Sequence, residues 1–269
     1  MIASARMYEW SPSLTVAWGR LLRWVVARAG VPLDVESAAT ALVPLDEIWQ
    51  RDDLGCVFMC GYPWASRPDR PHLLAGPVPS QSRYGGQPVY FTDFIVRTDG
   101  PHRTLEDTFG GTIAYSAETS HSGYNAARFH LLSHRGPDRP ELYGRVLGPL
   151  GRQLAVIDAV IDGKADVGPI DGFALDLLRR HGQERAARVR VVGTTVAAPS
   201  APLVASPMTG ADARARLTEA LCAVHEAPEM ASTLEAVLLT RFVRVTPAAF
   251  DVFIDRRRAA EDAGYPKLA

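Results

Sequence analysis

The chain has 269 residues, of which 47% are hydrophobic, and its formal net charge is −1. This length suits one large α/β domain or two lobes of ordinary size. A charge so close to zero excludes a broad electrostatic attraction to nucleic acid or to an anionic membrane surface, so any anion site has to be local. Cys56 and Cys60 lie too far apart along one predicted strand for a disulfide, and with Cys222 they do not suggest a secreted disulfide framework.

The first third of the chain alternates predicted strands and helices. Strands are predicted at residues 2–10, 33–37 and 54–60, and a short helix at 44–50. A longer helix at 14–29 follows the start signal Ser11-Pro12-Ser13 and ends at Gly30. This βαβαβ order predicts a parallel sheet. Residues 66–87 are rich in proline, glycine and arginine and are predicted to be mostly loop.

Two alternating segments, at residues 88–97 and 188–195, predict long strands that cross between two lobes. Between them we expect strands at 112–115 and 165–170 and helices at 124–132, 154–161 and 173–181. After residues 197–207, predicted as loop, helices are expected at 211–224, 232–239 and 247–263.

The sequence therefore predicts a two-lobed α/β fold, in which each lobe is a mainly parallel sheet flanked by helices and two crossing strands join the lobes. Lobe 1 would comprise residues 1–92 and 196–269, and the inserted lobe 2 residues 93–195. Two lobes with such crossings form a hinge around a cleft.

A polar turn, Glu118-Thr119-Ser120-His121-Ser122-Gly123, stands between the predicted strand at 112–115 and the predicted helix at 124–132. Hydroxyls and unpaired N–H groups that meet at a helix N-terminus form a small anion site. The alternative is that Ser120 or Ser122 only caps the helix.

Three further residues lie at or just after the ends of predicted strands, at the edge where ligands bind in such sheets: Tyr8, Tyr62 and Asp171. For the tyrosines the alternative is packing in the core or at its rim. For Asp171 the alternative is a cap on the helix that follows, which does not exclude ligand contact.

Three sequence runs, YFTDFIVRTDG, TLEDTFGGTIAYSAETSHSGYNAARFHLL and DAVIDGKADVGPIDGFALDLL, resemble the phosphonate-binding family of ABC-transporter substrate-binding proteins. The resemblance covers roughly residues 54–203 and implies the type 2 periplasmic-binding fold. In that family a turn rich in serine and threonine grips phosphonate or phosphate oxygens, which the resemblance places on Ser120, His121 and Ser122, with Thr119 adjacent. It also implies Tyr8 and Tyr62 at the cleft edge and Asp171 facing an amino group of the ligand.

Gln153 departs from the family pattern, because members often carry a histidine at the aligned position. A glutamine can donate a hydrogen bond but cannot carry charge. Arg152 could add a bidentate contact. The sequence therefore favours a small anion (phosphonate, phosphate, sulfonate or carboxylate) more strongly than phosphonate itself.

Three functions remain open. The first is a non-catalytic binding protein that closes on a small anion, through a population shift, and serves an ABC permease. The second is a cytoplasmic enzyme on the same fold, resembling chorismate dehydratase of the menaquinone pathway, with Asp171 or Glu118 as acid or base. The third is a cytoplasmic metabolite sensor. The start of the chain does not resemble a secretory signal, so we expect a cytoplasmic protein, or a periplasmic one if a signal has been removed.

Catalytic and metal motifs find little support in the sequence. Ser120 and Ser122 flank His121, but chain neighbours rarely adopt a Ser–His nucleophile geometry and no third partner is evident. His130 and His134 have the spacing of a metal pair without a third ligand. We expect no catalytic residue, no metal and no cofactor.

Overall fold

A computed structural model of the protein describes residues 1–35 and 43–269. The chain forms two compact units, which we call unit 1 (Met1–Val89 and Pro199–Phe250) and unit 2 (Tyr90–Ala198 and Asp251–Ala269). Two of the segments that pass between the units, β5 (Val89–Tyr90) and β11 (Ala198–Pro199), pair as a two-stranded sheet. The chain passes a third time after Phe250, so the C-terminal helix belongs to unit 2 and not to the first lobe, where the sequence placed it.

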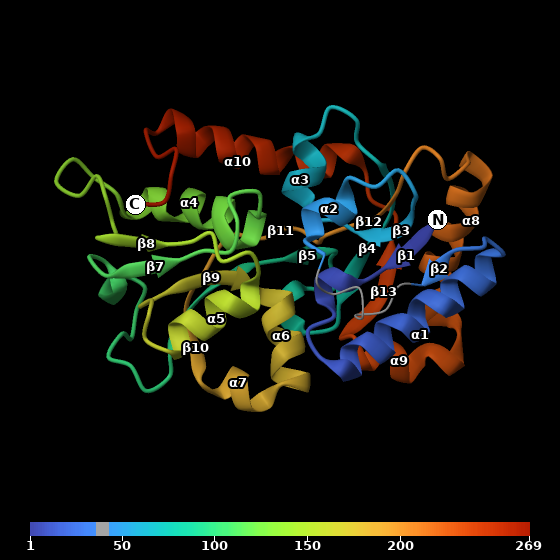
Figure 1. Ribbon diagram of the computed structural model, residues 1–269, viewed down its shortest axis with the longest axis horizontal. Coiled ribbons are helices and arrows are strands. Elements are labelled where there is room, and N and C mark those ends of the chain that lie inside the picture. The colour runs from blue at the N-terminus through green and yellow to red at the C-terminus, as the bar shows by residue number, and fades with distance from the viewer. Residues whose placement is uncertain (36–42) are drawn as a thin grey trace. The chain divides into compact units, whose positions relative to one another are not determined.

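Unit 1 is built on a six-stranded sheet of order β13-β4-β12-β3-β1-β2 (Figure 1). Its strands are β1 (Ile2–Ser4), β2 (Asp34–Val35), β3 (Leu54–Phe58), β4 (His72–Pro79), β12 (Leu203–Ala205) and β13 (Leu239–Val243). β1 pairs in parallel with β2 and β3, whereas β12 pairs antiparallel with β3 and β4, and β13 antiparallel with β4. The sheet is therefore mixed and not mainly parallel.

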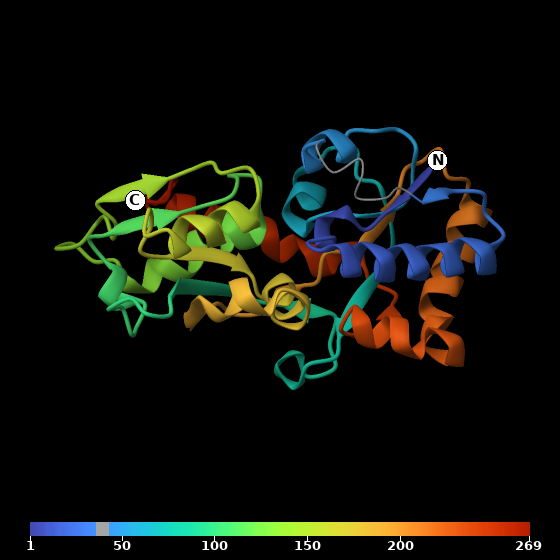
Figure 2. The same cartoon turned by 60° about the horizontal axis from the view of Figure 1, so that its bottom comes forward.

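The helices of unit 1 include one, α1, whose two ends carry capping residues. They are α1 (Pro12–Ala29), α2 (Leu45–Trp49), α3 (Gly61–Ser66), α8 (Ala211–Ala223) and α9 (Ala231–Ala236), with short 3₁₀ turns at Arg6–Tyr8, Ser82–Tyr84, Val224–Glu226, Pro228–Met230 and Pro247–Phe250. In α1, Ser11 Oγ accepts a hydrogen bond from Leu14 N, and Gly30 closes the helix with a φ of 61°. The buried face of α1 carries Trp18, and the helix packs against α8 and α9 (Figure 2).

Unit 2 contains a three-stranded antiparallel sheet of order β10-β6-β9 and a parallel pair of β7 and β8. The strands are β6 (Thr92–Arg97), β7 (Thr112–Ala114), β8 (Arg145–Leu147), β9 (Gly168–Asp171) and β10 (Val189–Thr194). A parallel bridge between Ile113 and Val167 connects the pair to the β9 side of the sheet. The register places Thr92 opposite Asp171 and Asp93 opposite Thr194.

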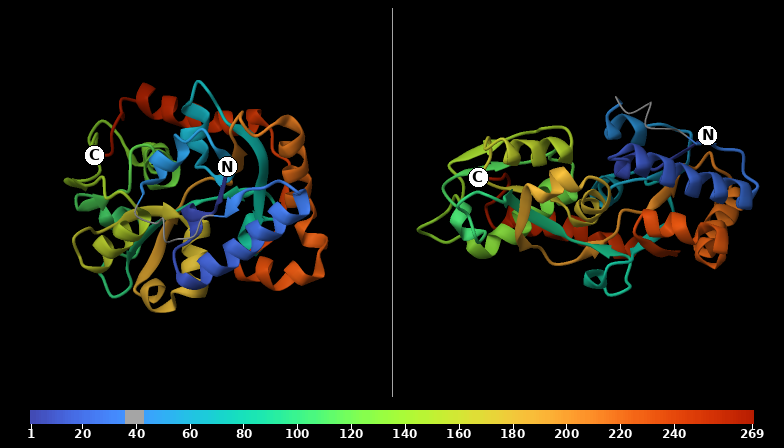
Figure 3. Two further views of the ribbon diagram at one scale, coloured as in Figure 1. Left: turned by 45° about the vertical axis from the view of Figure 1, so that its right-hand side comes forward. Right: turned by 90° about the horizontal axis from the view of Figure 1, so that it is seen from below.

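The helices of unit 2 are α4 (Ala126–Leu131), α5 (Gln153–Ile161), α6 (Gly172–His181), α7 (Gln183–Ala187) and α10 (Asp251–Asp262), with a π-helical turn at His121–Asn125 and 3₁₀ turns at Glu106–Thr108 and Leu132–His134. The π turn continues without a break into α4, and α10 packs against both. The C-terminus lies beside the β7–β8 part of the unit (Figure 3), where the Ala269 carbonyl oxygen accepts from Leu142 N at 2.9 Å. Tyr115, Tyr124, Leu131 and Tyr265 share one hydrophobic core cluster.

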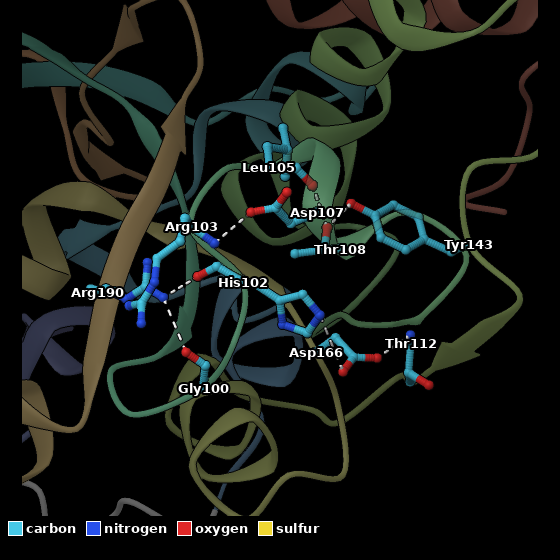
Figure 4. A network of polar contacts seen from close by, with 10 residues as sticks. All are labelled: Gly100, His102, Arg103, Leu105, Asp107, Thr108, Thr112, Tyr143, Asp166 and Arg190. Atoms are coloured by element: carbon cyan, nitrogen blue, oxygen red, sulfur yellow. Dashed lines mark hydrogen bonds and ion pairs between the residues drawn. The ribbon is translucent and has the colours of Figure 1, made fainter.

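The loop that leads into β7 is fixed by a polar network (Figure 4). Arg190 of β10 donates to the carbonyl oxygens of Gly100 and His102. Farther along, Thr108 Oγ1 lies 3.2 Å from Tyr143 Oη. Asp166 Oδ2 accepts from Thr112 N at 2.7 Å. These contacts anchor the start of β7, the strand whose far end carries the polar turn.

Several elements differ from the sequence prediction. β4 and β12 lie in segments predicted as loop, and β13 begins at the end of a segment predicted as helix. The predicted strand at 33–37 is observed only as β2, and its residues 36 and 37 lie outside the described residues. Cys56, Cys60 and Cys222 are free thiols. Among the described residues, no helix is both long and apolar enough to span a bilayer.

Candidate functional site

Three neighbouring strands of unit 2 each lead into a helix at their carboxyl ends. β7 leads into the helical run that starts at His121, β8 leads through residues 148–152 into α5, and β9 leads directly into α6. Parallel pairing of β7 with β8, and the parallel bridge from β7 to Val167, align these ends at one edge. The amino ends of the three helices therefore gather there, where unpaired N–H groups and helix dipoles favour an anion.

The turn that follows β7 is held by its own hydrogen bonds. Ser120 is the N-cap, and its Oγ accepts from Gly123 N at 3.0 Å. Asn125 Nδ2 donates to the carbonyl oxygens of Glu118 and Ser120 at 3.0 and 3.1 Å. Arg128 Nη2 in turn donates to Asn125 Oδ1 at 2.7 Å. These hydrogen bonds set the shape of the turn within the segment. The bond from Gly123 N to Ser120 Oγ confirms that Ser120 caps the helix.

Gly123 allows the close approach that the turn requires. A Cβ atom at this position would lie 2.1 Å from Ser116 Oγ and 3.0 Å from Ser120 Oγ. Ser116 is buried and its carbonyl oxygen accepts from Gly151 N at 2.8 Å, so the loop before α5 is attached to the same turn.

The first N–H groups of the helical run face no acceptor within the described part of the chain. Among residues 1–35 and 43–269, the backbone N–H groups of His121 and Ser122 have no hydrogen-bond acceptor, whereas Gly123 N donates to Ser120 Oγ. Free N–H groups at a helix start are the donors that bind anion oxygens in proteins. The turn therefore offers two backbone donors side by side.

One side chain joins all three helix starts. Gln153, the first residue of α5, donates from Nε2 to Ser122 Oγ at 3.0 Å. Its Oε1 accepts from Asp171 N at 2.7 Å. Three of the residues predicted for the ligand site are thus brought into direct contact.

Asp171 is the N-cap of α6. Its Oδ1 accepts from Phe173 N at 2.8 Å and from Ala174 N at 3.1 Å. A second carboxylate, Asp93 of β6, is fully buried beside it: Asp93 Oδ1 accepts from Thr194 Oγ1 at 2.7 Å. The sequence analysis missed Asp93, although a charged residue within an otherwise apolar predicted strand was a usable signal.

The His121 side chain is 1% exposed. Its ring lies edge-on to Phe253 of α10, with centroids 4.4 Å apart, and 6.2 Å from the ring of Tyr90. Burial, with a smaller contribution from the charge of Arg256, holds the pKa of His121 well below its ordinary value, so the ring is neutral at pH 7. Within the described part of the chain neither ring nitrogen has a hydrogen-bond partner, so no Ser–His pair forms.

The remaining predicted residues lie outside this network. Thr119 is exposed in the turn. Tyr8 and Tyr62 belong to unit 1: Tyr8 is buried, with its ring 5.2 Å from that of Phe58, and Tyr62 is half-buried on α3. For Tyr8 the structure matches the packing alternative, and ligand contact by either tyrosine stays a prediction.

The histidine pair on the far side of the helical run does not form a metal centre. His130 and His134 have ring centroids 5.7 Å apart, and His134 Nδ1 lies 3.4 Å from Glu106 Oε1. In the described ranges no group of three or more histidine, cysteine, aspartate or glutamate side chains is placed to hold a metal ion.

Comparison with known proteins places this geometry in context. A sequence model of the family described as "ABC transporter, phosphonate, periplasmic substrate-binding protein" matches residues 8–250. A binding protein component of an ABC phosphonate transporter from Pseudomonas aeruginosa has a similar structure, with a TM-score of 0.77 and 17% identity over 98% of this chain and 87% of that chain. PhnD1 from Prochlorococcus marinus, solved in complex with methylphosphonate, gives a TM-score of 0.71 and 12% identity over 97% of both chains.

A third similar structure, XAC2383 from Xanthomonas citri bound to a chloride ion, gives a TM-score of 0.63 and 20% identity over 98% of both chains. At these identities the structural likeness shows the fold, which is the two-lobed type 2 periplasmic-binding fold. No protein with a curated description matches the chain.

Proposed function

Because the chain belongs to the family of periplasmic substrate-binding proteins of phosphonate ABC transporters, we propose that it binds a small oxyanion of the phosphate or phosphonate type at the polar turn of unit 2 and delivers it to a membrane permease. The observation that carries this proposal is that the N–H groups of His121 and Ser122, which have no acceptor among the described residues, lie beside the Ser120 and Ser122 hydroxyls. The enzyme and sensor alternatives receive no support from the comparisons.

The chemistry of the turn suits an oxyanion. Hydrogen bonds from backbone N–H and hydroxyl groups to a charged oxygen are stronger than those between neutral groups, and each contributes roughly 1.5–3 kcal/mol. The helix dipole adds a favourable field at the same point. A tetrahedral anion presents several oxygens, so it can engage Ser120 and Ser122 together with the two N–H groups.

Isothermal titration calorimetry with methylphosphonate, inorganic phosphate, methanesulfonate and acetate tests the proposal. We expect the protein to bind one or more of the tetrahedral anions, and Ser122→Ala to weaken that binding between about tenfold and a hundredfold. Ser133→Ala is the matched control, because Ser133 is an exposed serine after the end of α4 whose Oγ bonds only the His130 carbonyl oxygen within the described chain.

Thermal denaturation provides a second readout. A ligand at a hundred times its Kd stabilises the native state by about 2.7 kcal/mol, which raises the melting temperature measurably. If none of the four anions binds or shifts the melting temperature, or if Ser122→Ala binds as tightly as Ser133→Ala, the proposed function is wrong.

A further inference from the structure

The orientation of the Gln153 amide is fixed by its neighbour. Asp171 N is a backbone donor, so the Gln153 atom 2.7 Å away must be the amide oxygen, which accepts. The opposite end of the amide is then the NH₂ group, which can only donate. Ser122 Oγ, 3.0 Å from Gln153 Nε2, is therefore the acceptor of that hydrogen bond.

This polarity determines what the Ser122 hydroxyl can do next. Because a lone pair of Ser122 Oγ accepts from Gln153, the hydroxyl proton of Ser122 points away from Gln153. No described residue accepts that proton. Ser122 is 1% exposed, and a buried hydroxyl donor without an acceptor is costly. Ser120 has the same polarity, since its Oγ accepts from Gly123 N. Both hydroxyls are thus set to donate.

We propose that Gln153 is a positioning residue that fixes the Ser122 hydroxyl as a donor, so that the site selects an anion oxygen that carries no proton. This inference rests on the proposed function. The two serine hydroxyls and the N–H groups of His121 and Ser122 are all arranged as donors toward the ligand. A ligand oxygen that carries a proton would bring a donor against a donor.

The pH dependence of binding distinguishes such a site. The titratable and charged groups around the turn come from its own segment and from the elements packed against it: Glu118, His121 and Tyr124 of the turn, Asp93 of β6, Arg128 of α4, Arg152 before α5, Asp171 of β9 and Arg256 of α10. Burial keeps His121 neutral. A ligand that carries no proton between about pH 6 and 8 reports whatever these protein groups contribute, so the difference between such a ligand and a phosphonate follows the ionisation of the phosphonate.

Calorimetric titrations of the full chain from about pH 6 to 8 with two probes test this. Methylphosphonate loses its second proton near neutral pH, as phosphate monoesters do, whereas methanesulfonate carries no proton in this range. We expect the affinity for methylphosphonate to rise with pH and the affinity for methanesulfonate to stay level. Tighter binding of methylphosphonate at the lower pH would overturn the inference.

Two substitutions of Gln153 test its role directly. In Gln153→Glu one carboxylate oxygen accepts from Asp171 N and the other accepts from the Ser122 hydroxyl. The hydroxyl then donates to residue 153 and no longer to the ligand. We expect methylphosphonate binding near pH 8 to weaken at least tenfold and to recover partly toward lower pH, where the new carboxyl group becomes protonated and donates again. Gln153→Met, which keeps the length and removes the polarity, should weaken binding roughly threefold to tenfold.

A double-mutant cycle shows whether Gln153 acts through Ser122. In the Ser122→Ala background, Gln153→Met should cause little further loss, because the hydroxyl it orients is gone. In the Ser122→Ala background, the loss of affinity caused by Gln153→Glu measures the effect of the added charge alone. This loss is subtracted from the loss that Gln153→Glu causes in the wild type. Equal melting temperatures confirm that the variants are folded.

The outcomes separate the two proposals. If the wild type binds none of the four anions, the proposed function fails. If the wild type binds methylphosphonate but Gln153→Met and Gln153→Glu bind it equally well, or if their losses add in full to that of Ser122→Ala, the positioning role of Gln153 is wrong while the proposed function stands.

Discussion

Acidification should destabilise unit 2 through His121. The ring is 1% exposed, and no described residue accepts from or donates to its nitrogens. Its folded-state pKa lies well below the ordinary value of about 6.5 because burial, and secondarily the nearby Arg256, disfavours the charged form. The unfolded chain therefore binds a proton that the native chain does not, and stability falls as pH drops below about 6.5.

The size of this loss of stability follows from the one proton that the unfolded chain binds at His121 and the native chain does not. Each pH unit below the unfolded-state pKa costs about 1.4 kcal/mol while the native ring stays neutral. From pH 7.5 to 5 the contribution of His121 is therefore a loss of about 2 kcal/mol in the free energy of unfolding. His72 and His130 also have pKa values lowered mainly by burial, so they add to the total slope.

Comparison of the wild type with His121→Leu isolates this contribution. Hydrogen–deuterium exchange of peptides from α4 and α6, read at several pH values, reports the stability of unit 2. All five tryptophans lie in unit 1, so their fluorescence during urea unfolding serves as an internal control. We expect the pH slope of unit 2 to be shallower in His121→Leu, by about 2 kcal/mol over this range. An unchanged slope would refute the buried, neutral state of His121.

Three further predictions concern the same framework. Asp171→Ala removes the cap of α6 and should lower the free energy of unfolding by about 0.5–2 kcal/mol in urea titrations, whereas Asp171→Asn, which can still cap, should cost less. Gly123→Ala drives a Cβ atom against Ser116 Oγ and should cost about 1–3 kcal/mol, partly recovered in the double variant with Ser116→Ala; full stability of Gly123→Ala alone would contradict the close approach. Burial raises the pKa of the Cys56 thiol to about 12, so iodoacetamide should modify it only after unfolding, as peptide mass spectrometry can establish.

The sequence anticipated those elements whose ends carry local signals. α1 begins after its N-cap Ser11 and ends at Gly30, as the sequence predicted. The family resemblance indicated the fold. β4 was missed because Gly76, Pro77 and Pro79 are typical of loops, yet the strand lies between β12 and β13. Pro77 is accommodated there opposite Phe242 of β13. Tertiary pairing thus outweighed local propensity.

The residues of the polar turn could be named from the sequence, but the hydrogen bonds that connect them to other elements could not. The position of Ser120 before a helix indicated a cap, and the cap is present. No sequence pattern shows that Gln153 spans from Ser122 to Asp171, because that depends on three strand ends meeting at one edge. The ring of His121 lies between those of Tyr90 and Phe253, a contact that requires α10 to belong to unit 2, and ligand contact by His121 stays a prediction.

The most direct test of the account is a nuclear magnetic resonance titration of the full chain with methylphosphonate, in which the backbone amide chemical shifts are recorded. The account predicts that the largest shifts fall on the backbone N–H groups of His121 and Ser122, with smaller shifts at Asp171, and that Ser122→Ala reduces them at equal ligand concentration. Shifts that cluster on other helix starts, or a spectrum that methylphosphonate leaves unchanged, would contradict the claim that the polar turn of unit 2 holds the anion.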